Sequence, residues 1–218
     1  MDRWKELNGD VVREVRDVIL ERFGTNGDTV LVAVGGPGGT GKSTFSRALA
    51  DVLRHAEVLK LDDYKTERES RRAKGIYGPH PEANEMDLVH WHIEDIKNKR
   101  IFFKPIYDPR RGGIDLTEAY QPARFNIIDG EISTYERFME IIDFSVYIDA
   151  AFSTQLNTRL TRDIKEKGYT LQKALATFFG SNVREFLRYG TSGRDNADII
   201  LFCNSDYSLE VSEKNSRN

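Results

Sequence analysis

The stretch from Gly36 to Ser43 constrains the fold more than any other feature, because its spacing matches the phosphate-binding loop pattern G-x-x-x-x-G-K-[ST]. Residues 29–34 before it read as a buried strand, and residues 44–54 after it have apolar side chains at helical spacing. A strand, a glycine loop and a helix start point several backbone N–H groups at one anion. We expect phosphates to bind at Gly36, Pro37, Gly38, Gly39, Thr40, Gly41, Lys42, Ser43 and Thr44.

Within this loop, Lys42 is expected to reach the outer phosphates, and the Ser43 hydroxyl to hold Mg²⁺. Two other interpretations compete. A glycine-rich turn before a helix can be only a turn, but the Lys-Ser pair directly after a glycine argues against this. Glycines 36, 38 and 41 also fit the dinucleotide fingerprint of a Rossmann oxidoreductase, with Asp62 as the ribose-binding acid. That motif has no use for the Lys-Ser pair.

Length and composition limit the class of protein. A chain of 218 residues, 39% hydrophobic and 31% charged, suits one soluble α/β domain. A net charge of −3 argues against a dedicated nucleic-acid surface. The single Cys203 excludes an intramolecular disulfide, no apolar stretch is long enough for a membrane span, and no signal peptide is evident. We expect a cytoplasmic protein; the sequence leaves a homo-oligomer open.

Strands that are apolar throughout alternate with helices, which predicts a mostly parallel sheet with helices on both faces. The expected fold is an α/β, three-layer P-loop NTPase sandwich with a helical lid. It forms a single domain, residues 1–218. Its parts are an N-terminal helix within 1–28, a polar acceptor-site insertion at about 64–86, a lid and following helix at about 153–190, and a frayed tail at 205–218.

Ligands of parallel sheets bind beyond the carboxyl ends of the strands. Gly36, Asp62, Asp108 and Asp129 are all predicted to lie there, on separate elements. Asp129 closes an apolar strand and is the candidate partner of Ser43 for Mg²⁺, although a turn or capping role would also suit it. Asp62 is the candidate base, Asp63 is the competing choice, and one of the two would cap the following helix.

Basic side chains within 153–190 suit a lid over the phosphates. Arg159 and Arg162 lie one helical turn apart, and Lys167 follows. A solvated helix face with an Arg162–Glu166 pair is the alternative. Of the histidines, His80, which stands between two prolines in the insertion, is the one expected to meet a substrate.

Other P-loop classes fit less well, since a GTPase needs a guanine-reading Asn-Lys-x-Asp that this chain lacks, and transport ATPases and motors need longer chains. The pattern favours an enzyme that phosphorylates a small molecule. A nucleotide-binding module that senses ATP without transferring phosphate is the non-enzyme alternative, but a candidate base and a lid argue against it.

From about residue 30 to 204, the chain resembles the phosphoribulokinase/uridine kinase family of P-loop kinases. Residues 61–64 resemble the family's D-S-F-Y/H segment, which implies that Asp62 is the base and Tyr64 lies at the acceptor. Residues 79–88 and 104–108 look like its two acceptor-site segments, which implies acceptor contacts for His80, Lys104 and Tyr107. Residues 127–130 are similar to its V-I-E-G, with an aspartate in place of the glutamate.

Residues 159–168 resemble the family's lid sequence R-x-x-R-D-x-x-E-R-G. This resemblance implies that Arg162 and Lys167 contact the ATP phosphates, that Arg162 assists transfer, and that Arg159 contacts the acceptor. The resemblance therefore implies a kinase that uses ATP and Mg²⁺ and a small-molecule acceptor bearing a hydroxyl.

Three departures from the family pattern concern the acceptor. Pro79 stands where uridine kinases have a ribose-binding Asp, residues 109–112 replace the base-reading His, and Tyr169 replaces the last lid Arg. Arg110 and Arg111 suit an anionic acceptor such as a sugar phosphate or an acid, and would equally suit a solvated loop. The sequence leaves open a nucleoside, sugar, sugar phosphate or hydroxy acid as acceptor, and ATP or GTP as donor.

Overall fold

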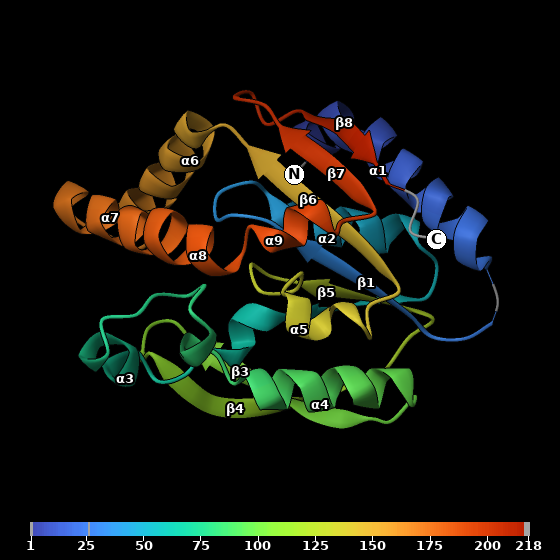
Figure 1. Ribbon diagram of the computed structural model, residues 1–218, viewed down its shortest axis with the longest axis horizontal. Helices are drawn as coiled ribbons and strands as arrows, with labels where there is room; N and C mark the ends of the chain where they lie inside the picture. Colours follow the sequence, from blue (N-terminus) through green and yellow to red (C-terminus); the bar gives the residue numbers. More distant parts are fainter. Residues whose placement is uncertain (1, 26, 216–218) are drawn as a thin grey trace.

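A six-stranded sheet forms the centre of the protein in the computed structural model, which describes residues 2–25 and 27–215 (Figure 1). The strand order is β2-β5-β1-β6-β7-β8, and all neighbours are parallel except β7 and β8. The strands are β1 (Val30–Gly35), β2 (Ala56–Lys60), β5 (Phe125–Asp129), β6 (Phe144–Ala150), β7 (Ile199–Cys203) and β8 (Leu209–Lys214). This order, with helices packed on the sheet, confirms the expected α/β class.

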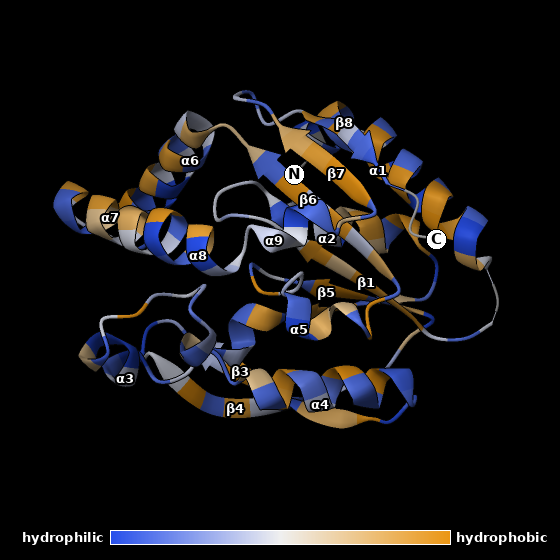
Figure 2. Ribbon diagram, viewed as in Figure 1, coloured by the Kyte–Doolittle hydropathy of each residue, from blue (hydrophilic) through white to orange (hydrophobic). Residues whose placement is uncertain are grey.

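Two helices cover one face of the sheet. They are α1 (Asp2–Phe23) and α2 (Lys42–Val52), whose apolar side chains pack with the even-numbered residues of β1. The opposite face packs against α4 (Met86–Lys97) and α5 (Glu136–Met139). Strands β1 and β5 are buried along their whole length, and their successive side chains pack alternately into the layers on the two faces of the sheet. Figure 2 shows the apolar colour along the central strands and a hydrophilic α3 (Arg68–Ala73).

A separate two-stranded antiparallel sheet follows α4 in the chain. It consists of β3 (Phe102–Asp108) and β4 (Gly113–Tyr120), and the sequence did not predict β4. Because β3 pairs with β4, Asp108 is not at the carboxyl edge of the main sheet, contrary to expectation. Its carboxylate instead accepts the Arg110 N–H at 2.7 Å in the hairpin turn.

The prediction of a frayed tail from residue 205 is wrong for most of that segment. Strand β8 pairs antiparallel with β7, and Leu209 is buried. Asn8 of α1 joins this edge, because its Oδ1 accepts the Leu209 N–H at 2.6 Å and its Nδ2 donates to the Tyr207 carbonyl at 3.1 Å. Residues 216–218 of the predicted tail lie outside the described residues.

The segment expected to form the lid and following helix is mostly helical, with a non-helical link at residues 166–170. It contains α6 (Phe152–Lys165), α7 (Leu171–Phe178), a π-helical turn labelled η3 (Phe179–Phe186) and α8 (Leu187–Tyr189). The short α9 (Ser192–Asp195) leads into β7. In Figure 1, α6, α7 and α8 lie at the left, and α3 lies below them. No helix among the described residues combines the length and the apolar character that a membrane crossing requires.

Candidate functional site

The glycine loop connects β1 to α2 at the carboxyl edge of the sheet. Gly36 has φ +123, and a Cβ there would lie 2.2 Å from the Ile148 carbonyl, so only glycine fits. Within the described residues, no amide N–H from 38 to 43 donates a hydrogen bond to the protein. The Thr40 hydroxyl donates to the Pro37 carbonyl at 3.1 Å and holds the bend from inside. A row of unused amides at a helix start is suited to an anion.

Lys42 supplies a buried ammonium to this loop. Its side chain is only 8% exposed, and its Nζ donates to the Pro37 carbonyl at 2.7 Å. Burial lowers the pKa of Lys42, an effect that Glu131, Asp129 and Asp62 partly offset. The ammonium therefore already faces three carboxylates.

Ser43 and Asp129 lie together, as a shared role would require. The Asp129 carboxylate accepts a hydrogen bond from the Ser46 hydroxyl at 3.2 Å, and Ser43 lies close enough to lower its pKa. Burial raises the pKa of Asp129, and Ser43 and the charge of Lys42 counter this only in part. Among the described residues, no group of three or more His, Cys, Asp or Glu side chains could hold a metal alone. A hydroxyl, one carboxylate and substrate phosphates are nevertheless a donor set that suits Mg²⁺.

The two candidate bases occupy different environments within the 3₁₀ turn η1 (Leu61–Tyr64). The Asp62 side chain is 81% exposed, whereas Asp63 is 18% exposed. Asp63 accepts a hydrogen bond from Lys104 Nζ at 2.9 Å and another from the Tyr107 N–H at 3.4 Å. Asp63 is therefore engaged in the local structure, and the Asp62 carboxylate is open to a ligand.

Four cations surround Asp62. The nearest contact is with Lys65, whose Nζ lies 3.6 Å from Asp62 Oδ1. The surrounding protein desolvates the carboxyl and raises its pKa, but Lys65, Lys42, Arg162 and Arg159 together hold the pKa of Asp62 below its usual range. Asp62 is therefore ionised at neutral pH.

Among the expected acceptor contacts, Tyr64 has a different place from the one predicted. It is fully buried in the layer under the sheet, and its hydroxyl is hydrogen-bonded to His92 Nδ1 at 2.7 Å. Its aromatic ring therefore supports the η1 turn from below and offers no surface to a ligand. Lys104 is also buried, and its Nζ pairs with Asp63 and with Glu118.

The other acceptor-side residues are more open. The Tyr107 hydroxyl bonds to Arg71 of α3, which also lies over its ring. Arg110 is exposed, and its side chain has no hydrogen-bonding partner within the described residues, whereas Arg111 pairs with Asp115 at 2.9 Å. Of the two arginines predicted to suit an anion, only Arg110 thus remains available.

His80 has partners for both ring nitrogens. Its Nδ1 accepts the Glu82 N–H at 3.1 Å, and its Nε2 is hydrogen-bonded to the Tyr189 hydroxyl at 3.2 Å. It stands before the short 3₁₀ turn η2 (Pro81–Ala83). Lys65 organises the same insertion, because its Nζ donates to Asn84 Oδ1 at 2.8 Å and to the Gly78 carbonyl at 3.0 Å.

Helix α6 brings Arg159 to the glycine loop. This arginine is 7% exposed and pairs with Glu131 at 3.3 Å, and a Cβ on Gly38 would lie 2.1 Å from its Nη1. Arg162 and Lys167 both pair with the buried Asp163, at 3.5 and 2.8 Å. The alternative Arg162–Glu166 ion pair is thus replaced by one with Asp163.

Tyr169 lies in the link between α6 and α7. Its ring is covered by Lys173, whose Nζ lies 3.8 Å from the ring centroid, and by Lys167 at 5.8 Å. It is therefore packed against two lysines, and among the described residues no hydrogen bond, ion pair or ring contact joins it to Asp62.

Three residues at the site were missed by the sequence reasoning. Glu131 contacts Arg159, and its charge reaches Lys42. Lys65 contacts Asp62, and Asn182 donates to the Gly38 carbonyl at 2.7 Å. Lys65 and Glu131 directly follow the selected segments 61–64 and 127–130, so proximity to those motifs was the available signal. Asn182 had none.

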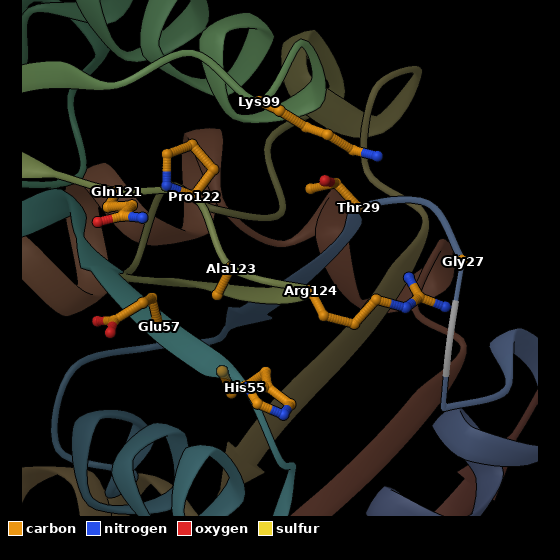
Figure 3. A pocket seen from close by; sticks show the side chains of 10 residues that line it. Gly27, Thr29, His55, Glu57, Lys99, Gln121, Pro122, Ala123 and Arg124 are labelled. Atoms are coloured by element: carbon orange, nitrogen blue, oxygen red, sulfur yellow. The ribbon is translucent and has the colours of Figure 1, made fainter.

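A cavity of about 560 Å³ lies at the amino-terminal edge of the sheet, away from this site (Figure 3). Side chains from the starts of three parallel strands line it, among them His55, Glu57 and Arg124, with Lys99 beside them. None of the predicted site residues contributes to it.

The sheet order and the glycine loop between β1 and α2 define a P-loop nucleotide-binding fold, and several solved structures with this fold are described as kinases or putative kinases. A putative fructose transport system kinase from Silicibacter sp. TM1040 superposes with a TM-score of 0.72 at 20% identity, covering 85% of this chain and 94% of that one. A D-glycerate 3-kinase from Cryptococcus neoformans gives 0.69 at 15% identity, covering 95% and 99%. These identities establish the fold alone.

The chain belongs to the phosphoribulokinase/uridine kinase family, whose pattern matches residues 31–209. It is 34% identical to phosphoribulokinase of Synechocystis sp. over 176 residues, which cover 79% of this chain and 53% of that protein. It is 24% identical to a uridine kinase of Borrelia turicatae, covering 78% and 85%. The chain thus spans about half the length of the phosphoribulokinases that it matches.

Proposed function

We propose that this protein is a kinase that transfers the γ-phosphate of ATP to a hydroxyl of a small metabolite, with Mg²⁺. One observation carries the proposal: the unused amides of residues 38–43 and the ammonium of Lys42 lie beside an exposed, ionised Asp62. A cradle for phosphates beside a carboxylate that can accept a proton is what phosphoryl transfer needs.

In this proposal Asp62 takes the proton from the attacking hydroxyl. Its exposure leaves room for the acceptor, and its lowered pKa keeps it ionised. Asp63 is the weaker candidate, because Lys104 and the Tyr107 amide already occupy its carboxylate. Asp63 instead anchors the hairpin β3–β4 to η1 and so fixes the direction of its neighbour.

Ser43 and Asp129 are the proposed holders of Mg²⁺, Ser43 directly and Asp129 directly or through water. When bound, the ion would neutralise charge on the phosphates. The raised pKa of Asp129 fits this role, because a buried carboxylate with no full counter-charge gains most from a cation. Ser46 holds the same carboxylate in place.

Positive charge over the transferring group would come from Arg162 and Lys167, with Arg159 toward the acceptor. Arg162 and Lys167 now pair with Asp163, and Arg159 pairs with Glu131, so phosphates would compete with these carboxylates. Helix α6 carries the two arginines on one face, which suits a clamp that closes when charge arrives.

For the acceptor we propose a hydroxyl compound bound between η1, the insertion near His80 and the hairpin. Candidate contacts are His80, Tyr107 and Arg110, since Tyr64 and Lys104 are buried. The exposed Arg110 suits an anionic acceptor, a sugar phosphate or a hydroxy acid, better than a neutral nucleoside.

The test is ATP consumption by the purified chain with Mg²⁺ over a panel of nucleosides, sugars, sugar phosphates and hydroxy acids. We expect turnover that depends on one acceptor class and yields ADP together with a phosphorylated product. Nucleotide binding without turnover on any member would instead favour an ATP-sensing module. Absence of nucleotide binding would contradict the proposal altogether.

A further inference from the structure

We propose that Asn182 is a positioning residue of the glycine loop, carried by the π-helical turn η3. This inference rests on the proposed function, because it concerns how the loop binds a nucleotide. Asn182 is 4% exposed although it is polar, and it lies 144 positions away from its partner Gly38 in the chain. A buried amide joined to a distant glycine loop is a costly arrangement unless its hydrogen bonds matter.

The orientation of the Asn182 amide is fixed by its partners. Its Nδ2 donates to the Gly38 carbonyl at 2.7 Å and to Gln155 Oε1 at 3.1 Å. The carbonyl can only accept, so the nitrogen must face the loop. Gln155 is itself held, because its Nε2 donates to the Ala150 carbonyl at 2.8 Å. The Asn182 Oδ1 is buried with no hydrogen-bond donor among the described residues, and it would lie 3.0 Å from a Cβ on Gly38.

The hydrogen bond from Asn182 orients the whole peptide group between Gly38 and Gly39, and not the Gly38 carbonyl alone. The Gly38 C=O and the Gly39 N–H belong to one planar trans peptide and point in opposite directions. Holding the carbonyl toward Asn182 therefore turns the Gly39 N–H away from α6 and η3. Gly39 has φ +91, so its backbone would otherwise have wide freedom. Asn182 thus reduces the ordering that nucleotide binding would have to impose on the loop.

The same π-helical turn supports the acceptor-side insertion. The ring of Tyr77 packs so closely on Gly180 that a Cβ there would lie 2.3 Å from it. Arg184 lies over the Tyr77 ring at 5.2 Å and donates to the Gly75 carbonyl. The glycine loop and the insertion therefore share one support, and π-helical turns occur frequently at functional sites.

The experiment measures affinity for the Mg²⁺ complex of a non-hydrolysable ATP analogue by titration calorimetry. Asn182→Ala should bind the analogue about three- to tenfold more weakly, the range expected for one hydrogen bond. The matched control is Ser181→Ala, because Ser181 is a buried neighbour in the same turn, and among the described residues it makes no hydrogen bond to the loop. The control should bind like the wild type.

Hydrogen exchange supplies a readout that a purely structural role would not move. With the analogue bound, amides 38–43 should exchange faster in Asn182→Ala than in the wild type, while amides of the central strands should not change. Asn182→Leu fills a similar volume without a donor, so it serves as the second variant if the alanine protein does not fold, with the same expectation.

Equal affinity and equal exchange for wild type and either folded variant would overturn the role of Asn182 while leaving the proposed function intact. Failure of the wild-type protein to bind the analogue would overturn the proposed function, and this role with it. Weaker binding by Ser181→Ala to the same extent would also overturn the role, because the effect would then belong to the turn as a whole.

Discussion

One side of the candidate site consists mainly of backbone groups, and the other consists mainly of side chains. The donor side is backbone: a loop held by glycine geometry and unused amides, with Lys42 behind it. The acceptor side is a set of side chains already paired with one another, such as Lys104 with Asp63 and Lys65 with Asn84. Backbone geometry leaves little room for variation, whereas paired side chains can be exchanged. We therefore expect the donor side to determine the chemistry and the acceptor side to determine the specificity.

The largest expected effect is at the donor side. Lys42→Ala should remove turnover almost completely, by at least about a hundredfold, since a charge aimed at the phosphates is lost. The measurement is steady-state turnover with the acceptor found in the panel. Burial lowers the pKa of Lys42, which means that its charge is costly to bury. Removing this side chain should therefore leave the fold intact, and the melting temperature checks this. Retained turnover would show that the loop does not hold the reacting phosphates.

A smaller but selective loss is expected at Asp62. Asp62→Asn should lower kcat by about a hundredfold to ten-thousandfold, the range for general base catalysis, and change nucleotide affinity much less. Removing an exposed carboxylate should cost little stability. Equal losses in kcat and in nucleotide affinity would move the base to Asp63.

The neighbouring Asp63→Asn variant makes the contrast between the two sides directly measurable. Lys104 would lose one of its two carboxylate partners while it stays buried, at a cost of about 1–3 kcal/mol in the free energy of unfolding. Denaturant unfolding should show this loss. Turnover per folded molecule should fall less than in Asp62→Asn; the reverse order would contradict the division of roles.

Asp129→Asn should stabilise the protein in the absence of metal. Burial raises the pKa of Asp129 above its unfolded value, so ionisation above that pKa opposes folding, and a neutral amide removes this penalty. For a gain of about 1 kcal/mol, the melting temperature should rise by about 2–4 °C. The increase in melting temperature that Mg²⁺ and nucleotide produce should shrink in the same variant. A lower melting temperature without metal would contradict the argument.

The smallest expected effect is that of mild acid on Asp62. A carboxyl whose pKa lies below the ordinary value of about 3.9 stays ionised from pH 8 down to about pH 5. The kcat/KM profile should therefore show no acid limb from Asp62 in that interval. An acid limb near pH 6 that disappears in Asp62→Asn would mean that the four cations do not act on this group as the structure indicates.

The sequence predicted most of the sheet because its central strands are apolar runs, and β5 ends at Asp129 as expected. It missed β4, where most side chains between 114 and 119 are exposed and polar residues separate the apolar ones, so no apolar run exists. It took β8 for a loose tail, although Leu209 and Val211 alternate with polar residues as an edge strand requires. Short alternating strands are easily confused with polar coil.

For the site, a contiguous motif was visible and tertiary neighbours were not. The residues from Gly36 to Ser43 are local in sequence, so spacing alone identified them. Tyr64 was expected at the acceptor from its motif, but burial depends on α4, which supplies His92. Asn182 reaches the loop through a π-helical turn, and such a turn has no periodic signature of its own in the sequence.

The pairing of β8 with β7, and its attachment to Asn8, has a practical consequence for anyone who shortens the chain. A protein cut after residue 204 would expose the outer side of β7, a strand of Ile, Leu and Phe, as an open template for other molecules. Such a fragment would keep the nucleotide loop and yet be prone to polymerise. Low solubility of that fragment would thus reflect an unprotected edge rather than a damaged nucleotide site.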